Sequence, residues 1–139
     1  MSESVEQRPS VDPGATASLT TTITEEDVLR FAEATGDQNP VHLDREVAAA
    51  SIFGRRVAHG MLSASLISAV LGTQLPGPGT VYISQDIRFR RPVYLGDTVT
   101  ASVTVTSVDV ERHQCVLATS VHNESGEIVL DGEARVRMP

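Results

Sequence analysis

The chain has 139 residues, of which 40% are hydrophobic and 21% charged, and its 18 acidic and 11 basic residues give a net charge of −7. This length predicts one domain around a single core. The acidic balance argues against nucleic acid as a partner, because phosphate binding needs a basic face. Every basic residue is Arg, so the lack of Lys excludes Schiff-base chemistry, and a single cysteine, Cys115, excludes an internal disulfide.

Residues 1–14 are polar, include Pro9 and Pro13, and lack the basic start and apolar run of a secretory signal. They predict a flexible N-terminal arm before a domain that spans residues 15–139. The most apolar stretch, Met61–Leu71, has 11 residues, too few to cross a bilayer. We therefore expect no membrane partner and a cytoplasmic location.

The first half of the chain predicts a short strand followed by helices. After a strand over Ala17–Ile23, Thr24 and Asp27 have the spacing of a capping box at the start of a helix over Glu25–Ala34. Gly36 is placed to end this helix, because glycine adopts the left-handed conformation at least cost.

A loop and two further helices are expected next. Residues 36–43 predict a loop, since Pro40 cannot continue the helix, and Asp44 can cap a short helix that runs through Ala50. Met61–Leu71 is apolar on nearly every side, which indicates a buried helix. The loop Leu75–Gly79 follows it.

The second half predicts an antiparallel sheet. Segments rich in Val, Ile and Thr, separated by turn residues, predict four strands: Val81–Phe89, Thr98–Val108, Gln114–His122 and Ile128–Met138. Helices followed by such strands indicate an α+β fold. A curved sheet that wraps around this helix best explains why the helix is apolar on nearly every side.

Asp37 and His42 are the first candidate functional residues. They lie five positions apart across the loop that Pro40 interrupts. A carboxylate and an imidazole that converge on one water can share general acid and base work. The same spacing also fits a plain turn whose side chains hydrogen-bond the backbone, and the spacing alone leaves both readings open.

His59 and Gly60 open the apolar helix and supply a second element. The first N–H groups of a helix have no internal acceptor and lie at the positive end of its dipole. Gly60 would let a ligand approach them closely and place a carbonyl oxygen on them, although it could equally serve tight packing alone. We expect His59 to be a polar cap or a loop contact rather than a second base.

Several motifs together resemble the MaoC-like family, and most closely its bacterial (R)-specific enoyl-CoA hydratases. The segment Gly36–His42 (GDQNPVH), with Phe31 before it and Ala48 after it, resembles their hydratase motif. Three further segments match in the same order: Ala58–Leu62, Leu71–Gly77 and Arg91–Asp97. The resemblance extends from about residue 19 to residue 139.

The resemblance implies a hot-dog fold, in which an antiparallel sheet wraps a central helix, and a homodimer with active sites near its interface. It implies that Asp37 and His42 bind one water and add it syn to a trans-2-enoyl-CoA, giving an (R)-3-hydroxyacyl-CoA. The Gly60 N–H would be the oxyanion donor, and no metal or redox cofactor is expected. Related possibilities are a dehydratase of acyl-carrier-protein substrates, a non-catalytic acyl-thioester-binding module and a hot-dog thioesterase.

Substrate-side residues can also be nominated. The arginine clusters offer four candidates for the coenzyme A phosphates: Arg55, Arg56, Arg88 and Arg90. An edge strand protected by charge, or surface ion pairs, would explain the same residues. The acyl chain would lie between helix and sheet, against Ser65, Ser68, Leu71 and Val136, each of which could instead be plain core. Four scattered histidines and one cysteine show no metal-ligand spacing.

Overall fold

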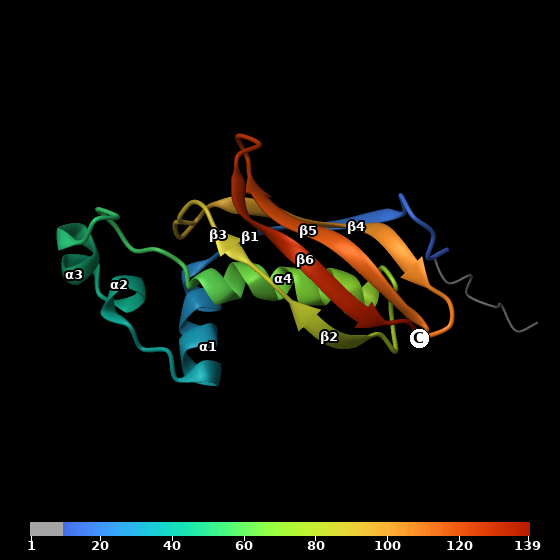
Figure 1. Ribbon diagram of the computed structural model, residues 1–139. Helices are drawn as coiled ribbons and strands as arrows, with labels where there is room; N and C mark the ends of the chain where they lie inside the picture. Colours follow the sequence, from blue (N-terminus) through green and yellow to red (C-terminus); the bar gives the residue numbers. More distant parts are fainter. Residues whose placement is uncertain (1–9) are drawn as a thin grey trace, which may run out of the picture.

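The apolar segment forms helix α4 (Gly60–Thr73) in the computed structural model, which describes residues 10–139. Its buried side chains, which include Ala64, Ile67, Val70 and Leu71, pack on the sheet, and Figure 1 shows the helix lying along one sheet face. No helix among the described residues is long and apolar enough to span a membrane.

The sheet is antiparallel throughout, with the strand order β1-β4-β5-β6-β2 and β3 paired to β6. Its strands are β1 (Thr16–Thr22), β2 (Val81–Gln85), β3 (Arg88–Phe89), β4 (Thr98–Asp109), β5 (Gln114–Asn123) and β6 (Ile128–Arg137). The alternation predicted for the longest strand is confirmed, since Val99, Ala101, Val103 and Val105 are all buried in the core. The predicted α+β arrangement, a sheet wrapped on a central helix, is therefore correct.

Three shorter helices lie at the N-terminal end of α4, beyond the sheet (Figure 1). They are α1 (Glu25–Thr35), α2 (Pro40–Leu43) and α3 (Arg45–Ala50). The capping box is confirmed: the Asp27 N–H donates to the Thr24 hydroxyl at 3.1 Å, and the Thr24 N–H donates to the Asp27 carboxylate at 2.9 Å. Gly36 ends α1 with a φ of 79°, and Asp44 caps α3 as expected.

Two sequence predictions were wrong in detail. Residues 36–43 do not remain a loop, because proline is well suited to the first turn of a helix and the Asn39 side chain caps Val41, so that α2 forms. The strand predicted over Val81–Phe89 is divided into β2 and β3. The interruption lies at Asp86, which packs closely against Gly132 of β6, and a register shift between Tyr82 and Ser84 lies within β2 itself.

The predicted arm falls partly outside the described residues, which begin at residue 10. Within the described part, the Gly14 N–H donates to the Val105 carbonyl at 2.8 Å, and Val11 packs against the core. Residues 11–14 are therefore docked on β4.

Candidate active site

The loop between α1 and α2 holds Asp37 at the open end of α4. Its shape comes from local hydrogen bonds: the Asp37 N–H donates to the Thr35 hydroxyl at 3.2 Å, and the Asn39 N–H donates to the Asp37 carboxylate at 3.3 Å. The Gln38 amide also donates to the Ala32 carbonyl at 3.1 Å. The turn reading of this segment is therefore correct as a description of its backbone, and it leaves the Asp37 side chain exposed.

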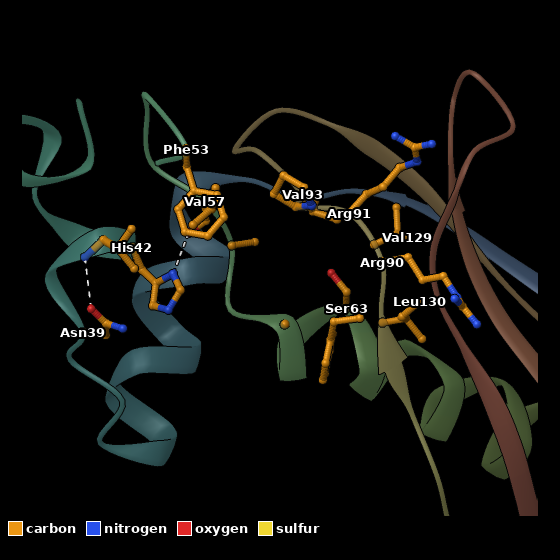
Figure 2. A pocket seen from close by; sticks show the side chains of 15 residues that line it. Asn39, His42, Phe53, Val57, Ser63, Arg90, Arg91, Val93, Val129 and Leu130 are labelled. Carbon is orange, nitrogen blue, oxygen red and sulfur yellow. Dashed lines mark hydrogen bonds between the residues drawn. The ribbon is translucent and has the colours of Figure 1, made fainter. Parts of the chain in front are cut away.

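His42 on α2 is 9% exposed and lines a cavity. Its Nδ1 lies 2.7 Å from the Val57 carbonyl, seen as a dashed line in Figure 2. Because a carbonyl only accepts, Nδ1 carries the proton and Nε2 keeps a free lone pair. Burial lowers the pKa of His42, an effect that the Val57 hydrogen bond and Asp37 oppose and that His59 reinforces.

Asp37, His42 and His59 form a compact group in which one nitrogen or oxygen atom from each lies within 4.8 Å of the others. The two histidine rings are 4.0 Å apart between centroids. The sequence shows no metal-ligand spacing, yet Asp37 and His59 come together in the fold although they are 22 positions apart in the chain. Each histidine nevertheless already uses one ring nitrogen on a backbone carbonyl.

The N-terminus of α4 faces this group with free donors. His59 is the N-cap residue, and its side chain makes no capping hydrogen bond to the helix. The first N–H groups, beginning with that of Gly60, are therefore free to meet an anionic or carbonyl oxygen. A methyl group at Gly60 would lie 2.8 Å from the Phe89 ring, so glycine allows this ring to cover the helix start.

The cavity, which His42 of α2 and Gly60 of α4 both line, has a volume of about 410 Å³ (Figure 2). His42 lies on one side of it, with Ser63, Arg90 and Arg91 on the other side, and Gly60 also lines it. The Ser63 hydroxyl points from α4 toward Val93 in Figure 2, and within the described part of the chain it is buried with no hydrogen-bond partner. Ser63, Phe89 and Arg91 are not among the site residues predicted from the sequence.

The four nominated arginines have different environments. Arg56 is largely buried and donates to the His42 carbonyl at 2.8 Å and to Glu25 at 2.7 Å, so it holds the helices together. The Arg55 guanidinium stacks on the Tyr94 ring at 3.9 Å, and Arg88 lines a different cavity. Arg90 alone of the four lines the cavity of His42, and it also lines the cavity of Arg88, where it pairs with Asp131.

A second hollow, of about 590 Å³, lies between α4 and β2 and is largely apolar. Of the residues nominated for the acyl chain, Ser65 and Ser68 line it, beside Phe31 and Met61. Leu71 and Val136 lie in the closed core at 1% and 0% exposure, and they line neither hollow.

Comparison with known proteins gives the family. A family model described as "MaoC like domain" matches residues 6–126. The chain belongs to the MaoC-like family.

Among curated MaoC-like relatives, an (R)-specific enoyl-CoA hydratase of Rhodospirillum rubrum is 46% identical over 93% of this chain and 89% of its own length. A 3-hydroxybutyryl-CoA dehydratase of Methylorubrum extorquens is 50% identical over 93% of this chain and 82% of its own length. The solved (R)-hydratase of Aeromonas caviae superposes with a TM-score of 0.91 and 41% identity, covering 94% of this chain and 98% of the other. These relatives are hydro-lyases by name, and the MaoC-like chain shares their hot-dog fold.

Proposed function

We propose that this MaoC-like protein adds water reversibly and syn to a trans-2-enoyl-CoA to give an (R)-3-hydroxyacyl-CoA. The observation that supports this most directly is the free Nε2 of His42. His42 lies in one compact group with Asp37. It lines a cavity that Gly60, at the uncapped start of α4, also lines. Relatives named as hydratase and dehydratase over nearly the whole chain support the same reaction.

Asp37 and His42, the dyad, transfer the protons of the reaction. A water held between His42 and Asp37 gives its oxygen to Cβ of the substrate and its proton to the dyad, and the dyad returns a proton to Cα. Because both groups lie on one side of the bound enoyl group, oxygen and hydrogen add to the same face. The Val57 carbonyl holds the His42 ring in the tautomer whose Nε2 can accept the proton.

The start of α4 stabilises the charge that forms in the reaction. When water attacks Cβ, negative charge moves onto the thioester oxygen. The Gly60 N–H and the positive end of the helix dipole are placed to bind this oxygen, and such preorganised donors contribute strongly to catalysis. No step needs a metal or redox cofactor.

The substrate runs along the cavity in one direction. With Cβ near His42 and the thioester near Gly60, the coenzyme A phosphates extend toward Arg90 and Arg91. The acyl chain continues past the dyad into the hollow beside Phe31, Ser65 and Ser68.

Substitution of the dyad tests this function. We expect Asp37→Asn and His42→Ala each to lower the kcat for crotonyl-CoA hydration by on the order of 10³, because each loses one proton-transfer group. Loss of the enoyl absorbance measures the rate, and circular dichroism checks the fold. His122→Ala, at the end of β5, is the matched control and should keep full activity.

Near-normal turnover in either dyad variant would contradict the mechanism. Release of free thiol would instead reveal a thioesterase. A clear preference for carrier-linked over CoA substrates would reveal an acyl-carrier-protein dehydratase. Tight acyl-CoA binding without turnover would reveal a binding module.

We also propose that the protein acts as a homodimer through β2. This strand ends the sheet path, and its neighbourhood exposes large apolar side chains: Met61, Val81, Tyr82, Ile83 and Phe89. Because a second copy would cover this face, it would also close the acyl hollow, whose lining includes Met61, Tyr82 and Ile83. The cytoplasmic location stays a prediction, which cell fractionation tests.

A further inference from the structure

His59 is a buried histidine that the mechanism above does not use. It is 2% exposed, although it directly precedes a helix whose first N–H groups are open. Its side chain does not cap α4. Because this buried imidazole does not cap the helix, it must make its hydrogen bond and its ring contacts with other parts of the molecule.

Those contacts reach both members of the dyad. The Nε2–H of His59 donates to the Asp37 carbonyl at 3.0 Å. Its ring lies 4.0 Å from the His42 ring, and Phe31 on α1 packs against it at 4.8 Å between centroids. The other hydrogen bonds of the Asp37 main chain and side chain join it to residues two positions away, so His59 is its long-range tether among the described residues.

The hydrogen bond also assigns the protons on His59. A carbonyl can only accept, so Nε2 carries the proton and, in the neutral ring, Nδ1 is a bare acceptor. Nδ1 is buried without a partner in the described structure.

We propose that His59 is a positioning residue for the hydration reaction: through its Nε2–H and its ring it holds the Asp37 backbone and the His42 imidazole in the arrangement that binds one water. This rests on the proposed function of the dyad. His59 itself exchanges no proton with the substrate.

The pH dependence gives a readout that packing alone would not move. The titratable or charged groups that face His42 are Asp37, His59 and Arg56, whose Nε donates to the His42 carbonyl. Burial is the largest cause that lowers the pKa of His42, and His59 adds to it. Protonated His42 cannot accept a proton, so activity falls as the pH drops through its pKa, which lies below the ordinary value of about 6.5.

Two substitutions separate the hydrogen bond from the ring. His59→Phe keeps a buried ring and loses the donor, whereas His59→Gln can keep the donor. We expect His59→Phe to lower kcat by about 30-fold with KM within about threefold, because small misplacements of catalytic groups are costly. His59→Gln should retain at least about a third of the kcat, because a retained donor keeps the geometry.

The same variants are compared by NMR titration of the histidines. His59 lowers the pKa of His42, and phenylalanine removes this influence while preserving the burial of His42. His59→Phe should therefore raise the pKa of His42 and move the acid limb of kcat/KM to higher pH. The His59 ring of the wild-type protein should show the Nε2–H tautomer. Thr119→Val is the matched control: it removes a buried hydrogen bond, from the Gln85 amide at 2.9 Å, far from the dyad. It should lower the unfolding temperature and leave kcat and the pKa of His42 unchanged.

Wild-type kcat in His59→Phe would overturn the proposal. So would equal losses in both His59 variants with an unmoved His42 pKa, since His59 would then serve packing alone. A wild-type His59 ring with its proton on Nδ1 would also overturn it. If the wild-type protein fails to hydrate crotonyl-CoA, the proposed function fails, and the tautomer and the His42 pKa still decide whether His59 positions the dyad.

Discussion

Two serines on α4 lie in opposite environments. Ser63 is 1% exposed and its hydroxyl has no hydrogen-bond partner in the described structure, whereas the exposed Ser65 hydroxyl donates to the Leu62 carbonyl at 2.6 Å. An unpaired buried hydroxyl costs free energy of folding. We expect Ser63→Ala to raise the free energy of unfolding by about 1 kcal/mol, as measured by urea denaturation.

Ser65→Ala is the control on the same helix and should change the free energy of unfolding by less than about 0.5 kcal/mol. A loss of stability in Ser63→Ala would show that the hydroxyl has a partner in solution. Because Ser63 faces the cavity beside Gly60, a lower affinity for substrate in the stabilised variant would mark this hydroxyl as a substrate contact.

The sequence is sufficient to predict the role of a residue when its partners are close to it in the chain. Thr24 and Asp27 are three positions apart, so their mutual capping follows from spacing, and Asp37 and His42 share one motif. His59 and Ser63 could not be found in this way. The partner of His59 is a carbonyl 22 residues earlier, and the missing partner of Ser63 depends on which walls enclose it. These properties arise only when the loop docks on the start of α4.

At the scale of elements, Gly132 on β6 controls the break between β2 and β3. A Cβ at this position would lie 1.9 Å from the Asp86 carbonyl oxygen, and this oxygen belongs to the backbone and cannot rotate away. We expect Gly132→Ala to lower the free energy of unfolding by about 3 kcal/mol, because the overpacked backbone must shift. Thermal unfolding followed by circular dichroism measures the change.

Gly72 in α4 is the matched control, because a Cβ there meets nothing within 4 Å. Gly72→Ala should stabilise the protein by about 0.5 kcal/mol or more, since alanine loses less backbone entropy in a helix. Equal stability of Gly132→Ala and wild type would mean that β2 and β3 tolerate a different path. Phe89 and Arg90 would then be free to move at the cavity.

The break between β2 and β3 also explains why the sequence predicted one strand there. Val81–Phe89 is rich in strand-forming residues and contains no Gly or Pro, so that Ser84 and Asp86 alone do not mark a turn. The interruption comes from a close approach to another strand, which composition does not record. Helix α2 was missed for the opposite reason. A proline such as Pro40 cannot continue a helix from within but suits the first turn of a new one.

At the scale of the whole molecule, the helices α1 to α3 lie beyond the sheet, and the proposed active site is at the end of α4 that they adjoin (Figure 1). Most core residues come from α4 and the long strands and could be predicted from their hydrophobic patterns. The exposed apolar residues around β2 gave no separate signal, because on sequence alone they are further strand residues. Their exposure became evident only with the strand order, which leaves β2 at the end of the sheet path.

A charge on this face tests the proposed homodimer. Ile83 is 47% exposed on β2, and Ile83→Asp would place a carboxylate in the contact between two copies. We expect the wild-type protein to have twice the mass of the 14.8 kDa chain in light scattering, and Ile83→Asp to have the mass of one chain. Val110→Asp is the control, because Val110 is 82% exposed in the turn between β4 and β5 and does not line the acyl hollow, and it should leave the mass unchanged. Since Ile83 also lines the acyl hollow, the monomeric variant should lose affinity for longer acyl chains before it loses crotonyl-CoA turnover. A wild-type protein with the mass of one chain would contradict the dimer, and the exposed apolar face would then need another partner.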